Sequence, residues 1–141
     1  MTDVDITEEK ILKALNSVKR NKTEGIDGLN STLFIECKMG IVLPLKKIFQ
    51  HSIENSEIPL QWKMANVVPI FKKGSKKDIG NYRPVSLTCH VSKVLEKIIK
   101  EEIVKFLEDS KKITRSQHGF RSKKSCLTNL LQFMERIGTC G

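Results

Sequence analysis

The sequence predicts one α+β domain that is mostly helical and carries a single basic β-hairpin. Two observations support this fold class. Apolar residues recur at helical spacing in several segments, and the stretch 62–88 changes to a strand-like pattern. No internal repeat, low-complexity tract or linker divides the 141 residues, whose number fits one domain.

A first helix is predicted between Asp5 and about Arg20. Asp5 and Glu8 have the spacing of a capping box, in which each side chain bonds to a backbone N–H of the other residue. Helical periodicity follows at Ile11, Leu12, Leu15 and Val18.

The segment 21–38 predicts a loop followed by a short helix. Two glycines mark residues 21–28 as the loop. Asn30 or Ser31 can then cap a helix that runs through Lys38.

A third helix is predicted after Met39–Gly40, a step that we expect to separate it from the second. Pro44 is expected in its first turn, where a missing N–H is tolerated. The apolar stripe consists of Ile41, Val42, Leu45, Ile48, Phe49 and Ile53.

The stretch 62–88 predicts a basic β-hairpin. Residues 65–71 resemble a mostly buried strand, with Trp62 packed beneath the hairpin and Tyr82 filling the core. Around the turn, a single acid, Asp78, accompanies five cations, namely Lys72, Lys73, Lys76, Lys77 and Arg83. Such an element suits a triphosphate or a nucleic-acid backbone, and a solvated surface turn is the alternative.

A long helix is predicted from His90 to Asp109, with its charged side chains on a solvated face. Its apolar positions are Val91, Val94, Leu95, Ile98, Ile99, Ile103 and Leu107. Residues 110–124 then carry six Lys/Arg and no acid, which indicates a loop that either repels itself or is held by a polyanion. A last helix begins at Ser125 and stops at Gly138, with one apolar side formed by Leu127, Leu130, Leu131, Met134 and Ile137.

Charge favours a polyanionic partner. Lys and Arg number 25 against 16 Asp and Glu, a formal net charge of +9. Residues 63–124 hold 16 of the cations and 6 of the acids, so the basic surface belongs to the second half.

The first residues have neither the basic nor the apolar region of a secretory signal, and no apolar run approaches the roughly 18 residues of a membrane span. These patterns predict an intracellular chain without membrane contact, in either the nucleus or the cytoplasm. The four cysteines have no CxxC spacing, so they predict free thiols without a metal or cofactor: Cys37, Cys89, Cys126 and Cys140. His51, His90 and His118 are not spaced as metal ligands, and we assign them no chemical role.

Several motifs in order resemble the start of a reverse transcriptase domain of the LINE or jockey-like class, from retrotransposons without long terminal repeats. They are Trp62-Lys63, 68–74 (VPIFKKG), 81–88 (NYRPVSLT) and 117–121 (QHGFR). The loop 21–28 resembles the family pattern NKAPGPDG, and the similarity runs from about Ile11 to Ile137.

This resemblance implies that residues 1–141 form the fingers part of a right-hand RNA-directed DNA polymerase. The hairpin then closes over the incoming deoxynucleoside triphosphate, with Lys72 or Lys73 and Arg83 near its phosphates. An arginine fork can hold phosphate oxygens bidentately, and a lysine adds a mobile point charge. The implied partners are an RNA template and a DNA primer.

The family's next motif implies template and primer contacts in the second half of the chain. These fall on Gln117, Gly119, Phe120, Arg121, Lys123 and Lys124. The segment 122–126 (SKKSC) departs from the usual KGRST by losing a glycine, which changes the expected loop geometry.

The family's metal-binding aspartates are not in this sequence. Nucleotidyl transfer needs two metal ions, Mg²⁺ in the full-length enzyme, held by a palm run such as FxxAFD and a later [FY]xDD. The acidic pairs Glu8-Glu9, Glu101-Glu102 and Glu108-Asp109 fall in or beside predicted helices, where a solvated face is expected. We therefore expect palm and thumb to be absent and no catalytic residue to be present. The chain would be a polymerase fragment that is inactive alone, and the alternatives are a non-catalytic nucleic-acid-binding module or a degraded remnant.

Overall fold

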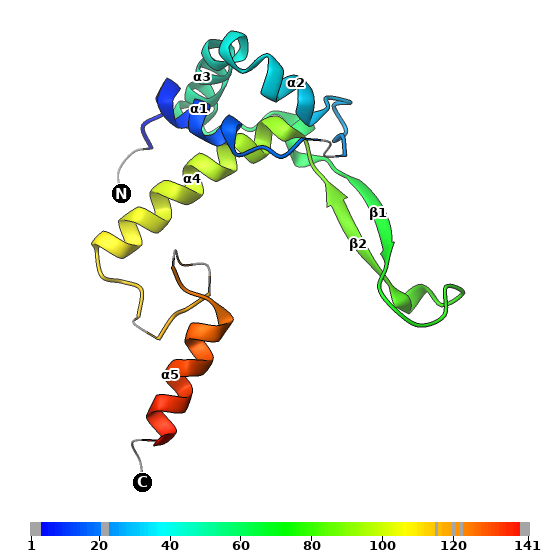
Figure 1. Ribbon diagram of the computed structural model, residues 1–141. Helices are drawn as coiled ribbons and strands as arrows, with labels where there is room; N and C mark the ends of the chain where they lie inside the picture. Colours follow the sequence, from blue (N-terminus) through cyan, green and yellow to red (C-terminus); the bar gives the residue numbers. More distant parts are fainter. Residues whose placement is uncertain (1–3, 21–22, 115, 120, 122, 139–141) are drawn as a thin grey trace. The chain divides into compact units, whose positions relative to one another are not determined.

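The structure, a computed structural model, describes residues 4–20, 23–114, 116–119, 121 and 123–138. Its helices and strands confirm the predicted α+β character (Figure 1). In chain order they are α1 (Glu8–Asn16), α2 (Ser31–Glu36), α3 (Lys38–Glu54), η1 (Leu60–Lys63), β1 (Asn66–Phe71), η2 (Ile79–Asn81), β2 (Tyr82–Leu87), α4 (His90–Asp109) and α5 (Cys126–Gly138). Two compact units result, Met1–Glu102 and Ile103–Gly141.

The core of the first unit lies between α1, α2, α3 and the beginning of α4. Phe49 and Ile11 are 0% exposed, and Leu15 is 1% exposed. Each such side chain contributes about 1.5–3 kcal/mol when it leaves water. The other members of this core are Ile6, Ala14, Phe34, Val42, Leu45, Val94, Leu95 and Ile98.

The first helix is shorter than predicted and has a different cap. The Thr7 side chain, and not Asp5, accepts the N–H of Lys10 at 3.3 Å. The helix ends at Asn16, where the hydroxyl of Ser17 donates to the carbonyl of Ala14 at 2.5 Å. A hydroxyl that bonds to a nearby carbonyl competes with helix continuation, which explains why Arg20 lies outside the helix.

The second and third helices meet at Cys37. The predicted cap by Asn30 is confirmed, since its side chain accepts the N–H of Thr32 at 2.6 Å. The predicted break at Met39–Gly40 is wrong, because α3 already begins at Lys38. Pro44 therefore lies beyond the first turn and removes an N–H that would bond to the Gly40 carbonyl. Burial on the same helix offsets this loss, at Val42, Leu45, Phe49 and Ser52.

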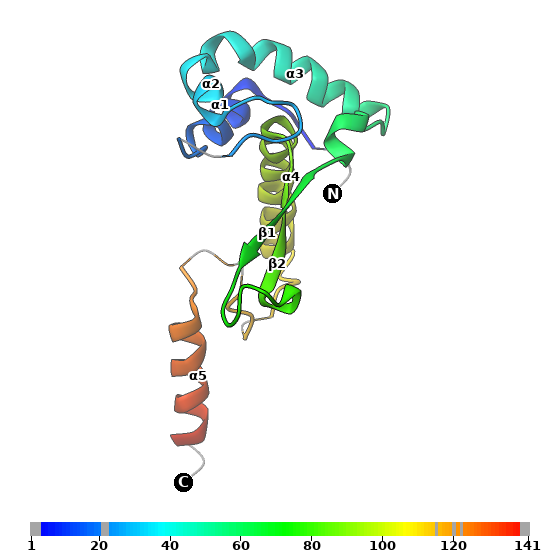
Figure 2. The same cartoon turned by 90° about the vertical axis from the view of Figure 1, so that its right-hand side faces the viewer.

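Strands β1 and β2 form the predicted hairpin, an antiparallel two-stranded sheet (Figure 2). Its register pairs Val68 with Val85 and Ile70 with Arg83. The prediction that the first strand is mostly buried is wrong, since all six residues of β1 are exposed. Branched apolar residues favour a strand whether or not other parts of the chain cover it.

Both aromatic residues assigned to the hairpin lie elsewhere than predicted. Trp62, in η1, packs edge to face on Phe49 of α3 with ring centroids 5.9 Å apart, so it joins the helical core. Tyr82 is half-buried, and its ring packs edge to face on Phe71 across the hairpin, with ring centroids 5.5 Å apart. It therefore stabilises the hairpin itself and not a larger core.

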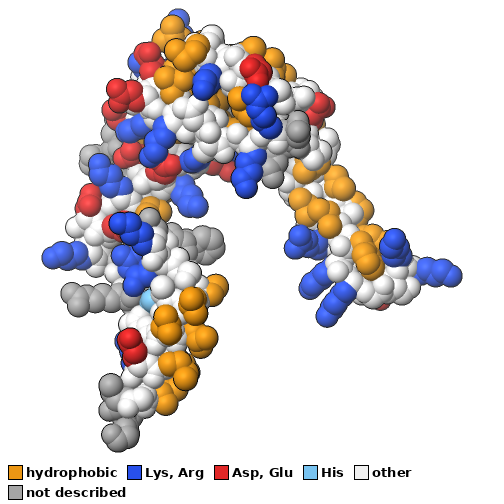
Figure 3. Space-filling model, in the orientation of Figure 1, with side chains coloured by type: hydrophobic (Ala, Val, Ile, Leu, Met, Phe, Trp, Pro, Cys, Tyr) orange, Lys and Arg blue, Asp and Glu red, His pale blue; other side chains and the backbone are white. Residues whose placement is uncertain are grey.

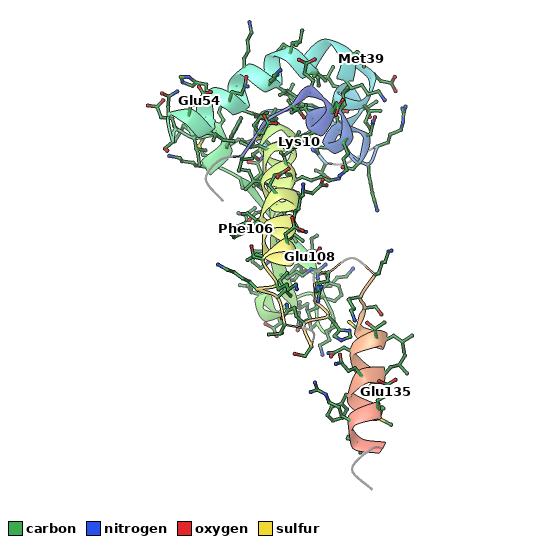
Figure 4. All side chains as sticks on the ribbon, turned by 90° about the vertical axis from the view of Figure 1, so that its left-hand side faces the viewer. Lys10, Met39, Glu54, Phe106, Glu108 and Glu135 are labelled. Atoms are coloured by element: carbon green, nitrogen blue, oxygen red, sulfur yellow. The ribbon has the colours of Figure 1, made fainter. Side chains whose placement is uncertain are left out.

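Helix α4 matches its predicted bounds, and its acids pair with α1. Lys10 lies beside α4 in Figure 4, and its Nζ is 2.9 Å from Glu102 Oε1. Lys13 Nζ is 2.7 Å from Glu101 Oε2. Glu101 is exposed, as expected for a solvated face, and Glu102 is half-buried. In addition, α1 supplies a counterion to each of these two glutamates.

In the second unit, α5 begins as predicted, with Ser125 Oγ accepting the N–H of Thr128 at 3.2 Å. Its apolar residues are exposed, between 54% and 63% for Leu127, Leu130, Leu131, Met134 and Ile137. Cys37, Cys89 and Cys126 are free thiols as predicted, while Cys140 lies outside the described residues. No helix in the described part of the chain is long and apolar enough to cross a membrane.

Candidate nucleic-acid interface

The basic turn of the hairpin is held in shape by three polar side chains. Asp78 Oδ1 accepts the N–H of Gly80 at 2.9 Å and so caps η2. The Asn81 side-chain amide donates to the Ser75 carbonyl at 2.9 Å. The Tyr82 hydroxyl donates to the Lys76 carbonyl at 3.0 Å. Asp78, the only acid of the turn, therefore bonds to the backbone. The turn has a defined conformation that positions its cations.

Gly74 is required by this packing. Its φ of +89° lies in the left-handed region, and a Cβ there would stand 2.7 Å from Asn81 Nδ2. Sequence reasoning did not assign roles to Asn81 or to the packing at Gly74. The signal was present as Asp78, Gly80 and Asn81 in close succession, residue types that bond to their own backbone in turns.

The predicted phosphate ligands Lys72, Lys73 and Arg83 are all exposed. Figure 3 shows Lys and Arg side chains gathered at the end of the hairpin, with hydrophobic side chains along the strands. None of the salt bridges found within the described ranges involves these three residues. Their charge is therefore available to an external anion.

Register brings Lys72 and Arg83 to one face of the hairpin. Arg83 is the partner of Ile70, and directly opposed residues project from the same face of a sheet. The N–H of Lys72 donates to the Asn81 carbonyl at 2.8 Å, which extends the ladder past Phe71. Because side chains alternate with period two, Lys72 returns to the face of Ile70 and Arg83.

The remaining predicted contacts belong to the second unit. Gln117 and Gly119 are exposed, and the Gln117 amide donates to the Gly119 carbonyl at 3.4 Å. Lys123 and Lys124 are exposed, and Lys123 has a φ of +59°. Phe120 lies outside the described residues.

Arg121 differs from these neighbours because it already has a protein partner. Its Nε is 3.4 Å from Glu108 Oε1, and the side chain is only 24% exposed. With Lys124 it lines an open cavity of about 550 Å³ whose other walls include Thr128 and Gln132. Glu108 would compete with a phosphate group for Arg121. Lys123 and Lys124 are therefore the more accessible cations of this segment.

His118, to which sequence reasoning gave no role, ties this segment to α5. It is 6% exposed, with Nδ1 2.8 Å from Thr128 Oγ1 and Nε2 2.5 Å from Gln132 Oε1. Its position between Gln117 and Gly119 in a motif was the available signal. We interpret it as a residue that positions the segment.

Comparison with curated proteins places these features in context. The chain is 27% identical over 130 residues to a probable RNA-directed DNA polymerase from transposon BS of Drosophila melanogaster, covering 92% of this chain and 14% of that protein. It is 28% identical over 120 residues to the corresponding X-element polymerase of the same species, covering 84% of this chain and 13% of that protein. A putative 115 kDa protein in the type-1 retrotransposable element R1DM, also from this species, is 31% identical over 107 residues, or 74% of the chain and 10% of the relative. No protein-family model matches the chain.

These relatives confirm the resemblance stated from the motifs. Over most of its length, the chain is homologous to RNA-directed DNA polymerases of non-LTR retrotransposons. It spans about one seventh of the length of the first of these relatives.

Proposed function

We propose that this chain is the fingers segment of a retrotransposon reverse transcriptase and that its hairpin binds the triphosphate of the incoming deoxynucleotide. The observation that carries the proposal is the ordered, exposed and unpaired basic end of the hairpin. Homology to RNA-directed DNA polymerases supplies the class of ligand.

Within this proposal Arg83 and Lys72 are the phosphate ligands. They share one face of the hairpin, and neither charge is neutralised by a salt bridge in the described structure. A guanidinium can hold two phosphate oxygens at once, and the nearby ammonium adds charge without fixed geometry. Lys73 sits in the bend beyond the ladder and contributes longer-range attraction.

Template and primer contacts fall to the second unit in the same proposal. Gln117, Lys123 and Lys124 are exposed there and suit a phosphate backbone. Arg121 joins them when a phosphate displaces Glu108.

The proposal includes no polymerisation by these 141 residues alone. Among the described residues, no three His, Cys, Asp or Glu side chains are grouped to hold a metal ion. The reaction needs such carboxylates. Any templated incorporation by the purified chain in a primer-extension assay would contradict this part.

A non-catalytic nucleic-acid-binding module is the second candidate function. It is favoured by the order of the hairpin end, whose cations and supporting hydrogen bonds all come from residues 71–83. A degraded remnant is the third interpretation, consistent with the exposed apolar side of α5.

Charge reversal tests the triphosphate site. We expect Arg83→Glu to weaken deoxythymidine triphosphate binding about tenfold, because a bidentate charge-assisted pair is lost. Lys77→Glu is the matched control, since it makes the same charge change in the same turn. Equal effects of the two variants would show that Arg83 acts only as a general surface charge and not as a specific phosphate ligand.

A salt titration tests the nucleic-acid contacts. Affinity for a single-stranded RNA of 12 uridines should fall steeply between roughly 50 and 200 mM salt, with a logarithmic slope of about −0.7 for each neutralised phosphate. A flat response would contradict phosphate contact. Lys123→Glu/Lys124→Glu should reduce the slope, while Lys38→Glu on α3 should leave it unchanged.

A further inference from the structure

A cleft of about 630 Å³ lies at the base of the hairpin, apart from its basic end. It belongs to the first unit, between β2, the end of α1 and the start of α4. Its walls are mainly aliphatic, formed by Ile70, Val85, Leu87, Val18 and Val94. No residue proposed above as a phosphate ligand lines it.

The cleft lies over one face of the hairpin at β2. Three consecutive residues, Val85, Ser86 and Leu87, line it. Val85 and Leu87 project from the same face of the hairpin as Ile70, which also lines the cleft, whereas the side chain of Ser86 between them projects from the other face. Within the described residues, strand β2 pairs with β1 alone, so its outer edge has no third strand there.

The ladder identifies which backbone groups are free. Lys72 and Asn81 form a hydrogen-bonded position, and such positions alternate with non-hydrogen-bonded ones. Alternation places the pairs Pro69–Pro84 and Val67–Ser86 at non-hydrogen-bonded positions. Ser86 therefore directs both its N–H and its C=O away from β1. Pro84, which has no N–H, offers only its carbonyl and limits where another strand can add.

The charged side chains that line the cleft have one sign. Lys19, Lys93 and Lys97 line the cleft, and no carboxylate in the described chain does. Lys97 has only a distant partner, Glu101, at 3.9 Å. An acidic ligand therefore complements the rim.

We propose that the cleft binds an extended peptide of alternating acidic and aliphatic residues, which adds to β2 as a third strand. Backbone hydrogen bonds at Ser86 fix the peptide on the edge. Its aliphatic side chains fill the cleft, and its carboxylates meet the three lysines.

A nucleic-acid strand fits this cleft less well. Single-stranded sites combine positive charge with aromatic side chains that stack on the bases. Among the described lining residues there is no Phe, Tyr or Trp, and the histidine present, His90, is only 4% exposed. The free strand edge also has no counterpart in a nucleic acid.

The test uses the full 141-residue chain and a fluorescein-labelled peptide of four Val-Glu repeats, with four Val-Lys repeats as the charge control. Fluorescence anisotropy should show binding of the acidic peptide only. Ser86→Pro should weaken it about fivefold to tenfold, because an outward N–H is lost and β1 pairing is untouched. Ser86→Ala keeps the backbone donor and should bind within about twofold of the unchanged chain.

A second measurement does not depend on the fold of the proline variant. In the unchanged chain, amide exchange at Ser86 should slow when the acidic peptide is added. Lys19→Glu/Lys93→Glu should lower the affinity for the acidic peptide about tenfold more than Lys77→Glu does. Unchanged exchange at Ser86, equal binding of both peptides, or displacement of the peptide by the 12-uridine RNA would overturn the proposal. Loss of triphosphate binding in Arg83→Glu tests the hairpin end separately.

Discussion

The side-chain amide of Asn81 donates to the carbonyl oxygen of Ser75 across the basic turn, at 2.9 Å. The same nitrogen is 3.4 Å from Asp78 Oδ2. One neutral side chain thus holds together a turn whose cations repel one another. The order of the binding surface depends on a residue that carries no charge.

Asn81→Ala should therefore weaken triphosphate binding about fivefold while every cation stays in place. Lost hydrogen bonds let the turn sample other conformations, and the ligand must then order it. Titration calorimetry gives the affinity, and amide exchange at Lys77 reports the order. Asn66→Ala, at an exposed position of β1, is the control; equal affinities for the two variants would contradict this role.

Gly25 makes a close backbone contact with the start of α4. A Cβ at this position would lie 2.7 Å from both Cys89 Cα and the Thr88 carbonyl oxygen. Gly25→Ala should reduce the free energy of unfolding by about 1–3 kcal/mol, because backbone atoms have to move. Urea denaturation measures the change.

Gly40→Ala is the matched control for this substitution. Gly40 lies in α3, and a Cβ added there would have nothing within 4 Å of it. Alanine should raise the free energy of unfolding there by about 0.5–1 kcal/mol. Equal destabilisation by both changes would show that the contact of Gly25 has no special weight.

Periodicity predicted the long helix α4 well, since its apolar positions repeat over 20 residues. It failed for β1, where Val67, Val68 and Ile70 indicated burial although all are exposed. A strand's own residues determine that it is extended, but its cover comes from other segments. Sequence alone does not specify that cover.

The sequence predicted which residues give the candidate site its charge, but not which of them form salt bridges. Lys72 and Arg83 stand out in the sequence, and their common face follows once the register is known. The pairing of Arg121 with Glu108 joins residues 13 apart through a loop, beyond any helical spacing rule. Local patterns identify cations, while tertiary contacts decide which of them are free.

The first unit should lose stability in mild acid because of His90. Burial, with Lys93 nearby, lowers the pKa of this imidazole below its ordinary 6.5, against smaller opposing effects of Asp27 and the Thr23 backbone. Below pH 6.5 the unfolded chain binds a proton that the folded chain resists. The free energy of unfolding should therefore fall as pH drops through 6.5, by at most about 1.4 kcal/mol per pH unit.

His90→Gln should remove that part of the pH dependence. Urea denaturation at several values between about pH 5 and 7.5 measures the slope. His51→Gln, on the exposed surface of α3, is the control and should keep it. The assignment to His90 is wrong if the two variants have the same slope as the unchanged chain.

His118→Ala should loosen the segment 116–119 from α5. Both imidazole nitrogens are within hydrogen-bond distance of α5 side chains, and the ring is buried, so its removal leaves Gln132 and Thr128 without that partner. Amide exchange at Gln117 and Gly119 should speed up severalfold, since a buried hydrogen bond contributes about 1 kcal/mol. If this segment contacts nucleic acid, the same variant should also have a lower affinity for the 12-uridine RNA.

A double-mutant cycle separates positioning from a general loss of packing. His118→Ala and Gln132→Ala, alone and together, should show an interaction energy of about 0.5–3 kcal/mol in the opening free energy of α5, obtained from its amide exchange. The cycle His118→Ala with Glu108→Ala provides the comparison, since Glu108 pairs with Arg121. Strict additivity of His118 and Gln132 would mean that their 2.5 Å contact contributes nothing to the attachment of this segment.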